Sequence, residues 1–320
     1  MNQTLTGLHH VTAIAGDPQA NVDFYTDILG LRLVKKTVNF DDPGSYHFYY
    51  GDGLGRPGTL LTFFAWPGGR RGRVGLGQVT AAALSVGPDA LNFWADRLHG
   101  HGVAVEEPVT RFGETVLPFT DPDGMRLELV ATPNDTRTGW ADGPIPAAVA
   151  VHGLHAVTLP ERDTRETIKL LTATLGFRRV AAEGDWTRLA LGGGGAGTYA
   201  DLYALPDALP GQVAVGNIHH VAWATPDDAQ EQAWLRQLGA LGVGVSPVMD
   251  RDYFHSIYFP EPGGVLFEIA TGNPGFATDE APEALGTSLC LPAKLEPMRA
   301  RIEARLPPVS VPKSGSRGGI

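Results

Sequence analysis

The chain has 320 residues, which is long enough for two domains or for one large double unit with a sizeable core. Its 25 lysines and arginines against 35 aspartates and glutamates give a net charge of −10, which argues against nucleic-acid or membrane partners. Hydrophobic residues make up 43% and charged residues 19%, a composition that excludes a disordered chain. The single cysteine, Cys290, excludes an internal disulfide. Because the sequence shows neither an export signal nor an apolar run of membrane length, we expect a cytoplasmic protein.

A short motif recurs along the chain. The sequence GLHHVT at 7–12 is nearly repeated as GLHAVT at 153–158 and as NIHHVA at 217–222, with a weaker copy, QVTAAALSV, at 78–86. Self-similarity of this kind indicates that one structural unit is built several times. We therefore expect four units.

Each copy of the motif is followed by an amphipathic stretch that closes on a glycine, and then by short alternating segments. These patterns predict helices, each followed by strands, so the unit is one strand, one helix and three strands. The helices are expected at 18–30, 89–102, 162–176 and 227–242. The four units span about 5–77, 78–134, 150–208 and 215–273.

The polar stretch between the second and third units predicts the boundary between domains. We assign residues 1–134 to an N-terminal domain that holds the first two units, and residues 150–275 to a C-terminal domain that holds the other two. Residues 276–320 form a C-terminal extension, which we expect to end in a frayed tail from Leu306 onward.

Two positions of the repeat carry groups that can bind a metal. The first-strand position holds His10, Ala81, Ala156 and His220, and the last-strand position holds Thr62, Glu128, Asp201 and Glu268. A carboxylate flanked by apolar residues, as in Leu-Phe-Glu268-Ile, is costly to bury unless it is paired or bound to a cation. A lone histidine is more often a hydrogen-bonded core residue, but two equivalent histidines with a glutamate predict a metal site. We interpret Glu128 and Asp201 mainly as structural or surface carboxylates.

The composition of the site depends on which units share a sheet. If neighbouring units pair, one site has only His10 and Glu128, and the other has His220, Asp201 and Glu268. If the first unit pairs with the fourth, a single site gathers His10, His220 and Glu268. We favour the second arrangement because it produces the set of two histidines and one carboxylate that suits non-haem Fe(II) oxygen chemistry.

The segments LHHVT at 8–12, IHHVA at 218–222 and PGGVLFE at 262–268 resemble those of the vicinal oxygen chelate superfamily. This superfamily includes glyoxalase I, fosfomycin-resistance proteins and extradiol ring-cleaving dioxygenases. Over about residues 5–305, the chain is most similar to the hydroquinone-type ring-cleaving dioxygenases. The resemblance implies an α+β fold in which four βαβββ modules form two curved, mixed-sheet half-barrels.

The resemblance also implies a ligand set and a reaction. His10, His220 and Glu268 would hold Fe(II), with Mn(II) as the alternative ion, and dioxygen would be the co-substrate for cleavage of a small aromatic substrate. The other positions that match the pattern, taken as candidate catalytic residues, are Tyr258, Arg251, His9, His219 and Thr12. Because successive strand residues point to opposite faces, His9 and His219 are expected to point away from the ligands. His255 is a spare candidate with no clear match.

Two alternative functions remain open at this point. A glyoxalase-like isomerase or thiol transferase repeats histidine and glutamate in both facing units, whereas the first unit here has Thr62 at the second glutamate position. Three ligands leave open positions on the ion, which favours ring cleavage over isomerisation. A non-catalytic small-molecule binding protein would need no metal, and the paired histidines argue against it. A homo-oligomer is compatible with the sequence.

Overall fold

The computed structural model describes residues 3–311, which follow the expected order of one strand, one helix and three strands four times over. The first unit consists of β1 (Gly7–Ala15), α1 (Pro18–Asp23) with a π-helical continuation η1 (Phe24–Ile28), β2 (Arg32–Val38), β3 (Tyr46–Gly51) and β4 (Leu60–Ala65). The second consists of β5 (Ala81–Val86), α2 (Leu91–Gly100), β6 (Val109–Arg111), β7 (Glu114–Thr120) and β8 (Arg126–Ala131). The third consists of β9 (Gly153–Glu161), α3 (Arg165–Ala173), β10 (Arg178–Glu183), β11 (Trp186–Ala190) and β12 (Tyr199–Ala204). The fourth consists of β13 (Ile218–Thr225), α4 (Asp228–Ala240), β14 (Met249–Asp250), β15 (His255–Pro260) and β16 (Leu266–Thr271).

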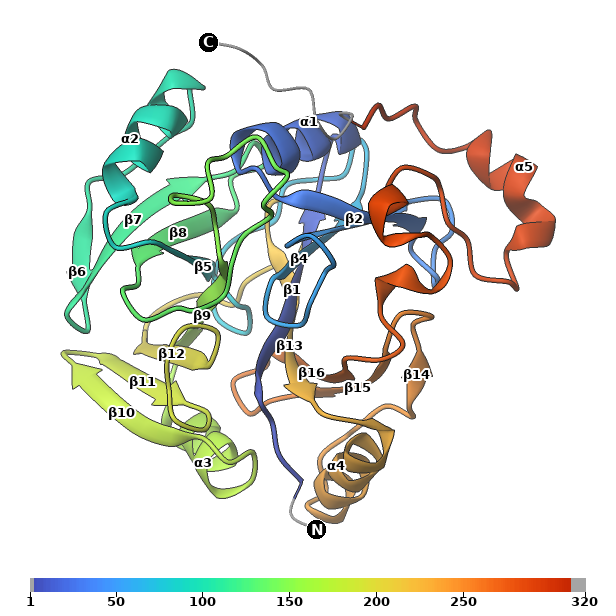
Figure 1. Cartoon of the computed structure of the whole chain (residues 1–320). Coiled ribbons are helices and arrows are strands. Elements are labelled where there is room, and N and C mark those ends of the chain that lie inside the picture. Colours follow the sequence, from blue (N-terminus) through green and yellow to red (C-terminus); the bar gives the residue numbers. More distant parts are fainter. Residues whose placement is uncertain (1–2, 312–320) are drawn as a thin grey trace.

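The strands form two curled, mixed sheets of eight strands each (Figure 1). The first sheet has the order β14-β15-β16-β13-β1-β4-β3-β2, and the second has the order β10-β11-β12-β9-β5-β8-β7-β6. At the centre of the first sheet, β1 runs antiparallel to β13. The first unit therefore shares a sheet with the fourth, and the second with the third. This confirms both the expected fold class and the preferred pairing of the units.

Local sequence explains where two of the helices begin and where all four helical stretches end. The side chains of Asp17 and Asp227 accept hydrogen bonds from the backbone at the start of α1 and α4, as N-cap residues do. The glycine that follows each helical stretch has a positive φ, from +67° at Gly30 to +80° at Gly176, a conformation that side chains disfavour. The expected helical segments are therefore confirmed, although the helices themselves are shorter.

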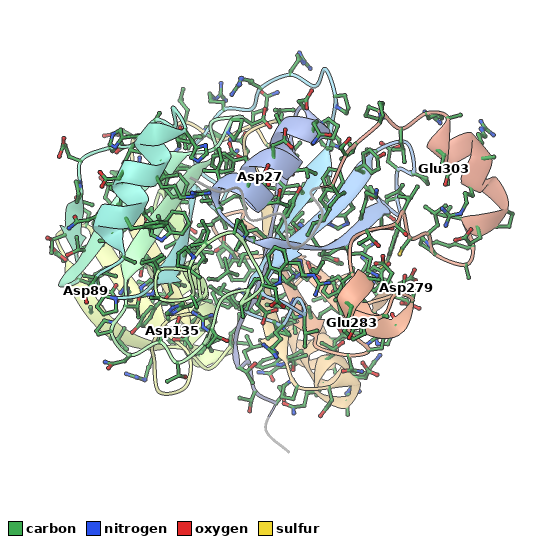
Figure 2. All side chains as sticks on the ribbon, turned by 45° about the horizontal axis from the view of Figure 1, so that its top comes forward. Asp27, Asp89, Asp135, Asp279, Glu283 and Glu303 are labelled. Carbon is green, nitrogen blue, oxygen red and sulfur yellow. The ribbon has the colours of Figure 1, made fainter. Side chains whose placement is uncertain are left out.

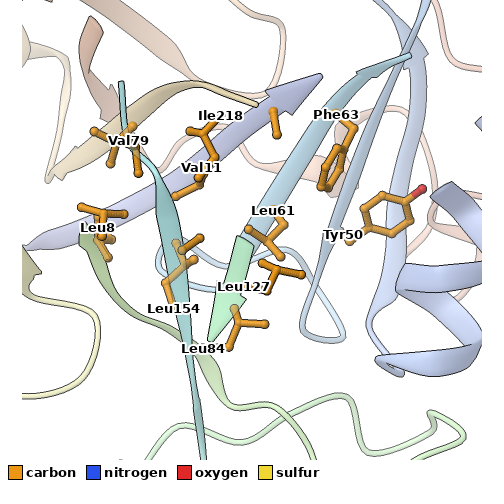
Figure 3. Packing of buried hydrophobic residues seen from close by; sticks show 14 of the residues in the cluster. Leu8, Val11, Tyr50, Leu61, Phe63, Val79, Leu84, Leu127, Leu154 and Ile218 are labelled. Atoms are coloured by element: carbon orange, nitrogen blue, oxygen red, sulfur yellow. The ribbon is translucent and has the colours of Figure 1, made fainter. Parts of the chain in front are cut away.

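The hydrophobic core lies where the two sheets face each other. Leu61 of β4 and Val11 of β1 come together there with Leu84 of β5, Leu127 of β8 and Leu154 of β9 (Figure 3). All five side chains are buried. Because strand residues alternate between faces, this packing leaves the opposite face of each sheet for other side chains.

The C-terminal extension packs against the first sheet. It contains η2 (Phe276–Thr278), η3 (Pro282–Ala284), η4 (Glu296–Met298) and α5 (Arg299–Glu303). Lys35 of β2 is completely buried, with its Nζ 2.5 Å from Asp279 Oδ1 and 2.6 Å from Glu280 Oε2. The ring of Phe276 lies 5.1 Å from that of Tyr49 on β3. The course of the extension can be followed in Figure 2 through the labelled side chains of Asp279, Glu283 and Glu303.

The expectation of a frayed tail from Leu306 is wrong for the part of it that the structure describes. Leu306 is buried in the core, and the Tyr46 hydroxyl donates a hydrogen bond to the carbonyl of Pro307. The amide of Ser310 donates to the side chain of Gln19. Residues 312–320 lie outside the described residues. Within 3–311, none of the helices is long and apolar enough to cross a membrane.

Candidate metal centre

Strand register confirms the alignment of the four units. In each unit, the residue at the last-strand position pairs with a residue of the first strand. This first-strand residue always comes two positions after the histidine or alanine of the motif. The pairs are Thr62 with Thr12, Glu128 with Ala83, Asp201 with Thr158, and Glu268 with Ala222. Equivalent positions in the sequence are therefore equivalent positions in the two sheets.

Three predicted ligands converge on one face of the first sheet. The Nε2 atoms of His10, on β1, and His220, on β13, lie 3.4 Å apart. The Oε2 atom of Glu268, on β16, lies 3.2 Å from the first nitrogen and 2.9 Å from the second. Donor atoms about 2.1 Å from a metal ion and at right angles to one another stand about 3.0 Å apart. The spacing of the triad therefore fits a single ion held by three adjacent ligands.

The electrostatics of the triad also fit a cation. All three residues are buried, and Glu268 Oε2 has no hydrogen-bond partner among the described residues. The other oxygen, Oε1, accepts a hydrogen bond from Ser256. Burial lowers the pKa of His220, which favours a neutral ring. A carboxylate beside two imidazole nitrogens is a donor set suited to a divalent metal.

His9 and His219 do not point away from the ligands, so this expectation was wrong. Their Nδ1 atoms lie 2.9 Å and 2.7 Å from the Nδ1 atoms of His10 and His220. The register between β1 and β13 shifts at both residues, where one strand holds an extra residue. A β-bulge breaks the alternation of faces, and the rings turn toward the neighbouring ligand.

The contacts of His9 determine which nitrogen of His10 carries the proton. His9 Nε2 lies 2.9 Å from the carbonyl oxygen of Thr271, so this nitrogen carries the proton and Nδ1 accepts. His10 Nδ1 then donates to His9, which leaves a lone pair on His10 Nε2. Burial is the main cause that lowers the pKa of His9 to about 3 and that of His219 to about 4. Both outer rings are therefore neutral.

Tyr258 and Arg251 lie beside the triad. Tyr258 is directly opposite Glu268 in the pairing of β15 with β16, and its ring is 5.8 Å from that of His220. Arg251 Nε lies 3.1 Å from the Tyr258 hydroxyl, and its Nη1 lies 3.2 Å from Asp41 Oδ2. Burial, reinforced by Glu268, raises the pKa of Tyr258 far above its usual range. Its hydroxyl is thus a proton-bearing donor beside a permanent cation.

Thr12 belongs to a polar chain that sequence reasoning missed. Its Oγ1 lies 2.7 Å from Thr62 Oγ1, which lies 3.0 Å from His47 Nε2. His47 Nδ1 in turn lies 2.9 Å from the Tyr49 hydroxyl. The available signal was the alternation of His47 and Tyr49 on the third strand of the first unit, which places both on one face.

His255, in contrast, lies at a different place. Its Nδ1 is 2.8 Å from Asp228 Oδ1 at the start of α4, on the surface. The neighbouring Phe254 does reach the site, because its ring lies 5.3 Å from that of His10.

The equivalent place in the second sheet is filled by charged pairs. Arg111 donates two hydrogen bonds of 2.9 Å to Glu128, and Arg188 donates bonds of 2.7 and 2.8 Å to Asp201. Both carboxylates are buried, so they are structural residues whose charge a guanidinium neutralises. Among residues 3–311, the other cluster of potential ligands is Asp279, Glu280 and Cys290, into which the Lys35 ammonium already points.

Comparison with known proteins identifies relatives that extend over nearly the whole chain. The protein of Bacillus subtilis named "Putative ring-cleaving dioxygenase MhqO" is 44% identical over 311 residues, which cover 97% of this chain and 99% of that protein. The "Chlorohydroquinone/hydroquinone 1,2-dioxygenase" of Sphingobium indicum is 36% identical over 303 residues, which cover 92% of this chain and 94% of that protein.

Solved structures agree with the fold. A crystal structure described as "putative dioxygenase from Bacillus subtilis subsp. subtilis str. 168", 44% identical, superposes with a TM-score of 0.93 over 98% of this chain and all of that one. Glyoxalase I from Zea mays, at 18% identity, superposes with a TM-score of 0.62 over 83% of this chain and 92% of that chain, a likeness of fold alone. The family profile described as "Glyoxalase/Bleomycin resistance protein/Dioxygenase superfamily" matches residues 7–129 and 153–269. The chain therefore belongs to the glyoxalase, bleomycin resistance protein and dioxygenase superfamily.

Proposed function

We propose that the chain is an Fe(II)-dependent, extradiol-type ring-cleaving dioxygenase that acts on hydroquinone or a substituted hydroquinone. The observation that carries the proposal is the donor set. His10, His220 and Glu268 converge on one face, and the position equivalent to Glu268 in the first unit is Thr62. Three protein ligands leave open positions on an ion, as non-haem iron oxygenases require.

The metal would be held by His10, His220 and Glu268. When bound, Fe(II) supplies a Lewis-acidic centre at which a phenolic oxygen and dioxygen can both bind, and Mn(II) is the alternative ion. His9 and, in the same way, His219 act as positioning residues, because each hydrogen-bonds the outer nitrogen of a ligand. His219 is half-buried and is the candidate for passing a proton to solvent.

Tyr258 and Arg251 stabilise negative charge that develops on the substrate. The Tyr258 oxygen accepts a hydrogen bond from Arg251, so its own proton is free to be donated to an anionic oxygen. The guanidinium charge lies next to this donor, and a donor and a cation that are already in place stabilise such an oxygen without further reorganisation. Thr12 contributes indirectly, through its hydrogen bond to Thr62.

The surroundings of the triad favour a flat aromatic substrate. The ring of Phe254 lies 5.3 Å from that of His10, and the ring of Phe64 lies 5.8 Å from that of His219. Aromatic side chains bind aromatic ligands through offset or edge-on ring contacts. The named activity of the Sphingobium indicum relative supports a hydroquinone as the substrate.

Oxygen consumption tests the proposal. Protein loaded anaerobically with Fe(II), and in parallel with Mn(II), is offered hydroquinone, chlorinated and methylated hydroquinones, and catechol. We expect oxygen uptake with a hydroquinone and the appearance of a semialdehyde absorbance. The variant Glu268→Gln should lose both metal and oxygen uptake, because it replaces the one anionic ligand.

The matched control is Glu128→Gln, at the equivalent position of the second unit. Because Glu128 is bonded to Arg111 in the other sheet, this variant should keep metal and oxygen uptake. Metal-loaded wild-type protein that consumes no oxygen with any of these phenols, but isomerises a thiol adduct of methylglyoxal, would contradict the proposal. A metal-replete, active Glu268→Gln protein would contradict the ligand assignment.

A further inference from the structure

Two tyrosines occupy equivalent positions on either side of the triad. Tyr258 is opposite Glu268 in the pairing of β15 with β16, and Tyr49 is opposite Thr62 in the pairing of β3 with β4. Because Thr62 and Glu268 are themselves equivalent, the two tyrosines are related by the pseudo-twofold symmetry of the sheet. The ring of Tyr49 also lies 6.4 Å from that of Phe254, which packs against His10.

The residues two positions before the tyrosines are equivalent as well. Ser256, before Tyr258, hydrogen-bonds Glu268, and His47, before Tyr49, hydrogen-bonds Thr62. In the first unit, the pair of serine and glutamate is thus replaced by histidine and threonine. Thr62, which stands where a fourth metal ligand could be, thus belongs to a chain of hydrogen bonds and not to the metal site.

The two tyrosine hydroxyls have different chemical partners. The partner of Tyr258 is the guanidinium of Arg251, which stabilises an anion. The partner of Tyr49 is a ring nitrogen of His47, 2.9 Å away. Burial, followed by the neighbouring His10, lowers the pKa of His47 well below its usual range, so the ring is neutral, and its Nδ1 accepts a hydrogen bond from the Tyr49 hydroxyl. One side of the triad therefore stabilises negative charge, and on the other side the Tyr49 oxygen can accept a hydrogen bond.

We propose that Tyr49, held in place by His47, accepts a hydrogen bond from the hydroxyl group of the substrate that does not bind the metal, and so selects diols with a second hydroxyl across the ring. This inference rests on the proposed function. It assigns a role to two residues that take part in neither metal binding nor the interaction of Arg251 with Tyr258.

The chain of hydrogen bonds gives every hydroxyl a donor and an acceptor role. The substrate hydroxyl donates to the Tyr49 oxygen, and the Tyr49 hydroxyl donates to His47 Nδ1. His47 Nε2–H donates to Thr62 Oγ1, and the Thr62 hydroxyl donates to Thr12 Oγ1. No proton is transferred in this step. The chain fixes the position of the second substrate oxygen, and the substrate stays a neutral phenol at that end of the ring.

The experiment compares wild-type protein with Tyr49→Phe, His47→Gln and the control Tyr50→Phe. Tyr50 is the next residue on the same strand, but its hydroxyl donates to Asn21 on the other face of the sheet. Turnover of hydroquinone is measured by oxygen uptake. Anaerobic calorimetry on the metal-loaded proteins compares the binding of hydroquinone with that of 4-methoxyphenol, in which a methyl group caps the second hydroxyl.

We expect Tyr49→Phe to lower kcat/KM for hydroquinone by about 10- to 100-fold, because the second substrate hydroxyl then has no acceptor in a buried site. Metal content should not change, and the preference for hydroquinone over 4-methoxyphenol, about tenfold or more in the wild type, should disappear. His47→Gln should weaken this preference less than Tyr49→Phe does, because the Tyr49 hydroxyl remains but loses the ring that holds it in place. Tyr50→Phe should behave as wild type in both assays.

The outcomes separate the two proposals. If the wild-type protein consumes no oxygen with any hydroquinone, the proposed function fails and this inference fails with it. If the wild type is active but Tyr49→Phe and His47→Gln stay within about twofold of it in rate and in binding preference, only the inference is overturned. If Tyr49→Phe does not fold, the expected weakening of the preference for hydroquinone in His47→Gln decides the matter.

Discussion

The hydrogen bond from His10 to His9 controls the orientation of a proposed metal ligand. The variant His9→Phe keeps a ring of similar size but removes both nitrogens. His10 Nδ1 then loses an acceptor 2.9 Å away, and the Thr271 carbonyl loses a donor at the same distance. His10 is 2% exposed, so water does not replace the lost partner. The His10 ring can then turn, or can place its proton on Nε2, where it faces Glu268.

The expected effect is on metal affinity. Loss of the outer hydrogen-bond partner of a metal-bound histidine typically weakens binding about 10- to 100-fold. At about 1.4 kcal/mol for each factor of ten, this corresponds to about 1.4 to 2.8 kcal/mol. We expect His9→Phe to bind Fe(II) and Mn(II) more weakly by this factor. An anaerobic competition titration against a chelator of known affinity measures the difference.

His155→Phe is the matched control, because His155 occupies the same position of the motif in the third unit. Its ring bonds Glu114 at 3.0 Å in the second sheet, away from the triad. This variant should lose some stability but bind metal like the wild type. Wild-type metal affinity in His9→Phe, or equal weakening in His155→Phe, would refute the reasoning.

Three further predictions concern stability. Arg188→Leu should lower the free energy of unfolding, measured by urea titration, by about 3–5 kcal/mol, because it leaves the buried Asp201 carboxylate unpaired. The double variant Arg188→Leu with Asp201→Leu should recover most of this loss, because it removes the buried charge as well. Burial is the main cause that raises the pKa of Glu161 from 4.5 to about 8 in the folded protein. The folded state therefore binds a proton that the unfolded state has already lost, and the free energy of unfolding should fall as the pH rises from about 4.5 to about 8. Glu161→Gln should flatten that dependence; an unchanged slope would contradict the assignment. Lys35→Met should speed proteolytic cleavage of the C-terminal extension, because the buried Lys35 ammonium forms an ion pair with Asp279 in that extension. Equal cleavage rates in the variant and the wild type would show that this ion pair does not hold the extension in place.

The units and the candidate ligands could be predicted from the sequence because they are repeated. A motif that folds into the same local structure four times puts equal positions of the sequence at equal positions of the sheets. This alone aligned His10 with His220, and Glu268 with Thr62, and the strand register confirms the second alignment directly. The glycines that end the helices were readable for a similar reason, since a positive φ is a local requirement.

Contacts between distant segments could not be read in this way. The bulges at His9 and His219 exist only because β1 pairs with β13, about 210 residues further along the chain, and strict alternation therefore predicted the wrong face. The chain from Thr12 to Tyr49 depends on the neighbouring strands β4 and β3, whose side chains carry no motif of their own. Nothing in a single strand shows which partner it will have.

The sequence by itself thus determined the repeat, the fold class and the residues able to bind a metal, because these follow from local periodicity and from the chemistry of side chains. Only the tertiary structure decided how those residues are used. Pairing of the first unit with the fourth brought two histidines and a glutamate together, and pairing of the second with the third left Glu128 to be neutralised by Arg111. The physical reason is that strand pairing and burial set the surroundings of a charge, and those surroundings decide whether a carboxylate bonds a guanidinium or faces a metal site.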